Sequence, residues 1–130
     1  MKTSEIVDEN ESTMGPNLPW EFNGHCATKI NSSHAIITGG IDYPHSHKTL
    51  IVQLDNFKMT DGPDMAGWGR WGHGCSQIIH PNGTNFIVVT GGLLGDNSDV
   101  SEILDVNDIE GGWFSGKRDK FKYNQIIFWE

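Results

Sequence analysis

The sequence predicts an all-β chain built from two copies of one four-stranded antiparallel unit, and three observations support this prediction. A short apolar run followed by Thr-Gly-Gly occurs twice, as HAIITGG at 34–40 and NFIVVTGG at 85–92. Other segments recur in the same order about fifty residues apart, which is the signature of an internal repeat. The sixteen Gly and five Trp also disfavour a helical bundle, because Gly weakens helix interiors and aromatic side chains suit pleated surfaces.

The two halves of the chain align over four landmarks. Besides the Thr-Gly-Gly segments, the matched pairs are MGPNL at 14–18 with DGPDM at 61–65, NGHCATKI at 23–30 with WGHGCSQI at 71–78, and LIVQLD at 50–55 with SEILDV at 101–106. The offset between matched positions drifts from 47 to 52 residues, as expected when turns differ in length while strands keep their register.

Each unit is predicted to contain four short strands separated by turn residues. The expected strands are 25–30, 34–38, 48–55 and 56–60 in unit one, and 74–79, 86–90, 100–106 and 111–116 in unit two. The second strand of each unit is a nearly unbroken apolar run, which is typical of a strand covered on both faces. We therefore expect the small sheets to stack on each other, as blades do in a β-propeller.

The residues that open each unit and end its second strand resemble the motif of kelch repeats, a family with about fifty residues per blade. The matching residues are Gly39-Gly40 and Gly91-Gly92 for the double glycine, Gly24-His25 and Gly72-His73 with Arg70 for the blade opening, and Trp113 for the motif's Trp. Leu54 and Leu104 stand where the motif has Tyr, and unit one lacks the Arg. The resemblance implies two four-stranded antiparallel kelch-type blades and an incomplete third, an open partial β-propeller.

The predicted organisation has four parts: a disordered acidic leader at 1–13, kelch blade 1 at 14–61, kelch blade 2 at 62–116, and a degenerate or truncated start of a third blade at 117–130. Propellers close with about four to eight blades. We therefore expect the chain to be a fragment of a longer propeller, with further blades or self-association through exposed blade faces covering its apolar surface.

Composition excludes several classes of partner. The net charge of −8 disfavours nucleic acid, because phosphate contacts require Lys and Arg. No run approaches the roughly 18 to 20 apolar residues of a membrane span, and the acidic N-terminus lacks the apolar core of a signal peptide, so cytoplasmic is the default location. Three Asn-x-Ser/Thr sites, at Asn10, Asn31 and Asn82, are interpreted as chance matches in a chain rich in Asn and Ser.

Histidines and cysteines recur near the start of each unit. His25 and His73 are predicted to hydrogen-bond a neighbouring turn or strand end, because repeated positions usually serve the repeat. Cys26 and Cys75 are predicted to be small buried thiols. A disulfide requires Cα atoms within about 7 Å, and equivalent positions on neighbouring blades often lie farther apart.

The resemblance implies a scaffold that binds another protein through the loops between its strands, where rigid folds place recognition residues. The candidate contact residues are Tyr43, His45, His47, Trp68, Arg70, Trp71, Asp96 and Asn97. Trp and Arg are favoured at binding hot spots. Arg70 and Trp71 also fall on the blade-opening motif, so packing is the competing role for both.

No catalytic constellation, metal site or cofactor is predicted. The pair His45 and His47 has a chelating spacing but no third ligand nearby, and no nucleophile, base and orienting group can be assembled from spacing. The alternatives to a binding scaffold are a fragment of a propeller enzyme of the kelch-like copper oxidase type and a truncated product without a function of its own.

Overall fold

The computed structural model describes residues 5–7, 12–20, 23–40, 45–65, 69–93 and 101–115, and these residues form an all-β protein. Two four-stranded antiparallel sheets and one two-stranded hairpin contain all of the strands in these ranges. The only helices in the same ranges are short 3-10 turns, none of which is long and apolar enough to cross a membrane. The all-β prediction is therefore confirmed.

The first sheet is a simple meander with the strand order β3-β4-β5-β6. Its strands are β3 (Cys26–Lys29), β4 (His34–Thr38), β5 (Thr49–Gln53) and β6 (Met59–Asp61). The apolar run Ala35 to Ile37 lies in β4, an inner strand, as its composition predicts. The 3-10 turn η1 (His45–His47) precedes β5.

The second sheet repeats this order as β7-β8-β9-β10. Its strands are β7 (Gly74–Ile79), β8 (Asn85–Thr90), β9 (Glu102–Asp105) and β10 (Phe114–Ser115). A 3-10 segment, η3 (Val106–Gly111), joins the last two strands, and the Asp105 carboxylate accepts a hydrogen bond from the Asn107 N–H where this segment begins. The third and fourth strands of both sheets are shorter than predicted, because turns occupy the residues between them.

The N-terminal region differs from the prediction of an unstructured leader. Residues Glu5–Val7 (β1) pair antiparallel with Ser12–Met14 (β2), with Glu5 opposite Met14. Ile6, Val7 and Thr13 are β-branched residues, which favour strands, although the acidic composition of the segment pointed to disorder. The expectation of disorder at 1–13 is wrong for these strand residues, and the predicted third unit at 117–130 lies outside the described residues.

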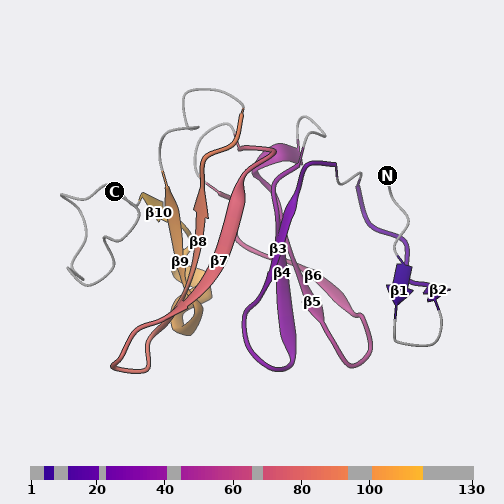
Figure 1. The fold of residues 1–130 in the computed structure, drawn as a ribbon, viewed down its shortest axis with the longest axis horizontal. Helices are drawn as coiled ribbons and strands as arrows, with labels where there is room; N and C mark the ends of the chain where they lie inside the picture. The colour runs from indigo at the N-terminus through magenta and orange to yellow at the C-terminus, as the bar shows by residue number, and fades with distance from the viewer. Residues whose placement is uncertain are drawn as a thin grey trace.

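The two large sheets lie face to face with their first strands, β3 and β7, next to each other (Figure 1). Apolar side chains from both sheets fill the space between them. Ile30 and Ile36 of the first unit meet Ile87 and Leu104 of the second, and each is at most 2% exposed. This shared core makes one packed body of the two sheets.

The opposite face of the second sheet has a smaller apolar cluster. Phe86, Val88 and Ile103 are buried there, with Ile78 packed against them. Phe114 is 38% exposed. The described residues of this face thus combine a buried apolar cluster with a partly exposed Phe114.

Candidate functional site

Arg70 forms a buried polar junction between the two units. Its backbone N–H donates to the Ser46 carbonyl at 3.1 Å, and its carbonyl accepts from the Gly40 N–H at 2.9 Å, so its main chain is bonded to the first unit. Its guanidinium reaches the second unit instead. Nη1 donates to the Gly91 carbonyl at 3.0 Å, and Nη2 donates to Glu102 Oε2 at 2.9 Å.

The ion pair between Arg70 and Glu102 is fully enclosed, with the two side chains 0% and 3% exposed. Burying two charges is costly unless good geometry and further hydrogen bonds compensate. Here the guanidinium has a carbonyl and a carboxylate as acceptors. The junction therefore fixes the relative position of the segments it joins. The prediction that Arg70 contacts a binding partner is therefore wrong, because its side chain is not exposed.

His73 forms a second contact across the junction. Its Nε2 lies 2.7 Å from the Oγ1 of Thr38, the last residue of β4 in the first sheet. Burial, the nearby Arg70 charge and His25 together lower the pKa of His73 from 6.5 to about 4. The imidazole is therefore neutral at pH 7 and takes part in a hydrogen bond between neutral groups. This is the kind of contact that the repeat position predicts.

The Thr-Gly-Gly segments provide the space for these contacts. Gly39 has φ +66°, and a Cβ there would collide with the Arg70 carbonyl and the His73 ring. Gly92 has φ +93°, and a Cβ there would lie 2.8 Å from the Trp71 carbonyl oxygen. Both positions combine a left-handed backbone with close approach of another segment, which only Gly satisfies without strain.

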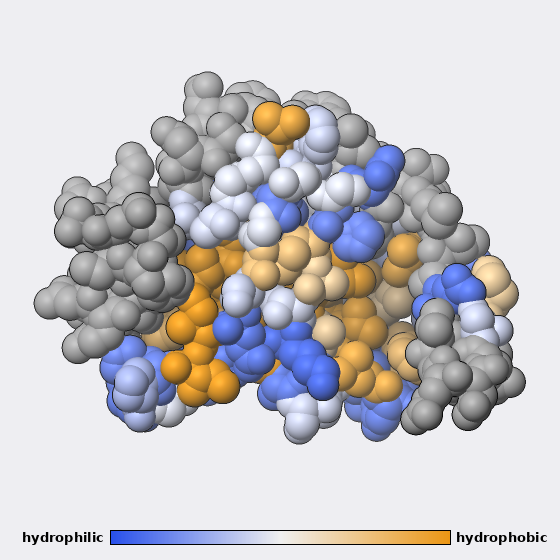
Figure 2. Space-filling model, in the orientation of Figure 1, coloured by the Kyte–Doolittle hydropathy of each residue, from blue (hydrophilic) through white to orange (hydrophobic). Residues whose placement is uncertain are grey.

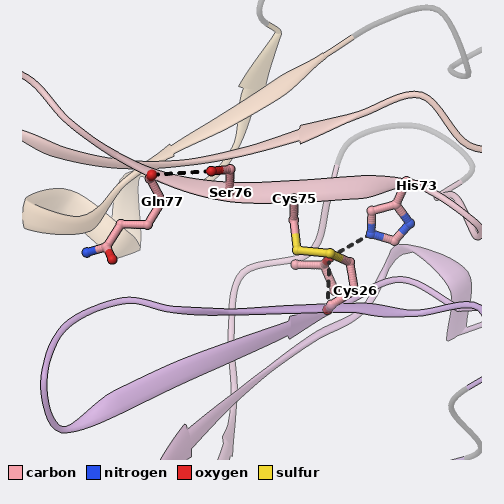
Figure 3. Close-up of a disulfide and its surroundings, with 6 residues drawn as sticks. Cys26, His73, Cys75, Ser76 and Gln77 are labelled. Carbon is pink, nitrogen blue, oxygen red and sulfur yellow. Dashed lines mark hydrogen bonds between the residues drawn. A yellow bond between two sulfur atoms is a disulfide. The ribbon is translucent and has the colours of Figure 1, made fainter.

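Cys26 and Cys75 form a disulfide that links β3 of the first sheet to β7 of the second (Figure 3). Their Cα atoms are 6.0 Å apart, within the range that a disulfide requires. They are the only two cysteines of the chain. The prediction of two buried thiols is therefore wrong.

The error has an identifiable cause, because the two cysteines are not equivalent positions. Cys26 pairs with Thr38 in its sheet, whereas the residue that pairs with the matching Thr90 is Gly74, so Cys75 lies one residue further along its strand. Successive side chains on a strand point to opposite faces. Cys26 thus faces forward to the second sheet and Cys75 faces back to the first. In the sequence, Cys26 follows His25 directly, whereas Cys75 lies two residues after His73. This difference of one residue was the signal.

The other end of the interface is held by a shared acceptor. The Ile30 carbonyl, in the turn after β3, accepts from Gln77 Nε2 and from Asn85 Nδ2, each at 2.8 Å. Both donors belong to the second sheet, on β7 and β8. The sheets are therefore bonded at both ends of their strands, with the disulfide and the His73 contact at one end and these amides at the other.

Few of the predicted contact residues can be placed at the surface. Trp71 is half-buried and forms an antiparallel bridge with Leu93, which is 57% exposed. His47 is partly exposed, and its Nε2 lies 3.5 Å from Asp64 Oδ2. His45 starts the 3-10 turn η1. The remaining candidates, Tyr43, Trp68, Asp96 and Asn97, lie outside the described residues.

The other predicted motif residues lie around the junction. The Gly72 N–H donates to the Gly24 carbonyl at 2.6 Å, and Gly24 lies against Trp71. Trp113 packs on the inter-sheet core and donates from Nε1 to the Pro63 carbonyl at 3.0 Å. These contacts are between or beside the sheets, and so they serve packing.

The side chains of the junction form a buried ion pair and a hydrogen bond to the first sheet. Within the described ranges no three His, Cys, Asp or Glu side chains converge as metal ligands would. A half-open hollow of about 180 Å³, lined by His34, Ile51, Gln53, Lys58 and Thr60, is smaller than the roughly 300 Å³ at which ligand pockets begin.

Comparison with known proteins adds no identification, since neither a protein-family model nor a curated protein matches the sequence.

Proposed function

We propose that the chain is part of a kelch-type β-propeller and works as a scaffold that binds another protein. The observation that carries the proposal is the repetition of one meander in two stacked sheets. Each sheet has four strands in sequential order, and the second strand of each ends in Thr-Gly-Gly. Stacked four-stranded meanders are the building units of propellers.

The His73 contact supports the same proposal. His73 belongs to the second unit and its hydrogen-bond partner, Thr38, ends the second strand of the first. The equivalent pair in a continuing array would join Thr90 to the His of a following unit, and His25 to the Thr of a preceding one. A contact that runs from each unit to the one before it can be repeated around a ring.

The proposed contact surface is the end of the sheets where the Thr-Gly-Gly segments leave their strands. Trp71, Leu93 and His47 lie at this end, and the predicted loop residues follow or precede them in the chain. A rigid scaffold with an exposed Leu beside a Trp offers the apolar contact that protein partners use.

Site-specific photocrosslinking tests the proposal. A photoreactive residue is placed at Leu93, and a matched one at Lys58, which is exposed at the turn end of the first sheet. In extracts of the source organism, we expect Leu93 to crosslink one defined protein and Lys58 to crosslink none. Trp71→Ala should reduce the Leu93 crosslink. Equal crosslinking from both positions, or from neither, would contradict the proposal.

A further inference from the structure

Asn31 and Asn82 occupy the same turn in the two sheets. Asn31 lies between β3 and β4, and Asn82 lies between β7 and β8. Each begins an Asn-x-Ser/Thr triplet without Pro, Asn31-Ser32-Ser33 and Asn82-Gly83-Thr84. Such triplets arise by chance, but both of these lie in the exposed turn between the first two strands of their sheets, one residue apart in the hairpin. Their position is therefore the first observation that points to modification.

Both side chains accept a hydrogen bond from the backbone N–H two residues later. Asn31 Oδ1 accepts from the backbone N–H of Ser33 at 2.9 Å, and Asn82 Oδ1 accepts from the N–H of Thr84 at 2.9 Å. The oxygen assignment follows from these donors. Because the amide group is planar, the Nδ2 of each residue points away from the backbone that its oxygen contacts. Both Asn residues are exposed, so this nitrogen is accessible.

The disulfide is an independent observation about the compartment. Cys26 and Cys75 leave no free thiol in the chain. Disulfides persist in secreted and extracytosolic proteins and are rare in the reducing cytosol. The same route supplies N-linked glycans to exposed Asn-x-Ser/Thr turns. The disulfide therefore argues against the cytoplasmic default.

We propose that the protein folds in the secretory pathway and carries N-linked glycans on Asn31 and Asn82. The donor is an oligosaccharide joined through its anomeric carbon to a lipid pyrophosphate. Nδ2 forms a bond to that carbon, the bond from carbon to pyrophosphate oxygen breaks, and one amide proton is released. No oxidant or reductant takes part, and the disulfide is already present in the structure.

The surroundings of both turns accommodate a glycan. The neighbour of Asn31, Ile30, is 2% exposed and is fixed by its bonds to Gln77 and Asn85, so a group on Asn31 projects away from the core. Both turns lie at the lower edge of the sheets in Figure 1, where hydrophilic residues alternate with apolar ones in Figure 2. The proposed protein-contact surface lies at the opposite end, so glycans at the turns leave it uncovered.

Analysis of the native protein tests the proposal directly. The protein is isolated from its source by antibody under non-reducing conditions, free thiols are alkylated, and glycans are removed with peptide N-glycosidase in heavy-oxygen water. This treatment converts each glycosylated Asn into a heavy-oxygen Asp. We expect conversion at both Asn31 and Asn82, together with one peptide pair linked through Cys26 and Cys75.

Expression in cultured animal cells, behind a heterologous signal sequence and on an Asn10→Gln background, provides matched variants. We expect two glycosidase-sensitive mobility steps. Ser33→Ala and Thr84→Ala should each remove one step, whereas Ser33→Thr and Thr84→Ser should keep both. Native protein with unmodified Asn31 and Asn82 would overturn the proposal even if the disulfide were found. Modification at one position alone would overturn it for the other.

Discussion

Arg70 and Glu102 form an ion pair that solvent does not reach, with Nη2 2.9 Å from Oε2. Unit one has no such pair. The residue that aligns with Arg70 in sequence is Phe22, which lies outside the described residues. The strand pairing places Leu50, which is 2% exposed, at the position of Glu102, one residue before the match that the sequence alignment gives. The same place in the repeat therefore has a charge pair in one unit and two apolar residues in the other.

Removing one charge of this pair should be strongly destabilising. Glu102→Gln leaves the Arg70 guanidinium buried without its counter-charge, and we expect a loss of about 3 to 5 kcal/mol in the free energy of unfolding. The double variant Arg70→Phe with Glu102→Leu copies unit one and should recover most of this loss, because apolar pairs avoid the desolvation penalty. Urea denaturation followed by Trp fluorescence measures both values.

The exposed ion pair between Lys48 and Asp64 provides the control for this prediction. Its side chains are 38% and 45% exposed. Lys48→Ala should therefore change the free energy of unfolding by less than about 1 kcal/mol. A similar loss from Lys48→Ala and Glu102→Gln would show that burial of the Arg70 pair has no special consequence.

The free energy of unfolding should decrease as the pH is lowered from neutral, because of His73. Its pKa is 6.5 in the unfolded chain and about 4 in the folded protein, so between these values only the unfolded chain binds the proton. The contribution of His73 to the free energy of unfolding is fully present above about pH 6.5. It decreases as the pH falls toward 4, by up to about 3 kcal/mol in all. His73→Gln should remove this component. Unfolding free energies of both proteins over this range measure it, and parallel curves would contradict the assignment.

Breaking the disulfide should destabilise the whole interface. The bond closes a loop of 49 residues between Cys26 and Cys75. A loop of this length corresponds to about 4 kcal/mol in the chain-entropy model, and measured losses range from about 2 to 5 kcal/mol. We expect a phosphine reductant to lower the denaturation midpoint of the native protein. The Cys26→Ser, Cys75→Ser variant should start at the lower midpoint and not respond to the reductant.

The first glycines of the two pairs should differ in their tolerance of Ala. Gly39 and Gly91 have nearly the same φ, +66° and +68°, but a Cβ on Gly39 collides with Arg70 and His73, whereas a Cβ on Gly91 meets no described atom within 4 Å. Gly91→Ala should cost only the backbone strain of about 1 to 2 kcal/mol. Gly39→Ala should cost more, since it adds a collision with backbone. Thermal unfolding compares them, and equal losses would contradict the crowding at Gly39.

The repeat made much of the fold predictable. The runs HAIIT and GCSQII form β4 and β7 with the predicted boundaries, because apolar periodicity and flanking turn residues agree there. Residues 56–58 were expected to form strand, yet they lie in or beside the turn before β6, where Phe57 adopts φ +58°. Apolar composition does not reveal a left-handed residue of this kind.

The junction was less predictable, because it depends on contacts between units. The motif marked Arg70 and His73, but their partners, Glu102 and Thr38, are 32 and 35 residues away in sequence. Sequence spacing alone does not specify such pairings. The Cys26–Cys75 bond depends on a one-residue difference in position that reverses a side chain from one face to the other. Reasoning from equivalent positions missed that reversal.

The disulfide also determines how the protein would carry a mechanical load. Every strand of the first sheet, from β3 to β6, lies between Cys26 and Cys75. A force applied to the two ends of the chain would pass directly across the sulfur atoms, so the roughly 170 Å of contour length in that loop could not be drawn out. Only the residues before Cys26 and after Cys75, which include most of β7 and all of β8 to β10, would extend. After reduction, the first sheet would enter the path of the force, and the redox state would thus set how far the molecule stretches.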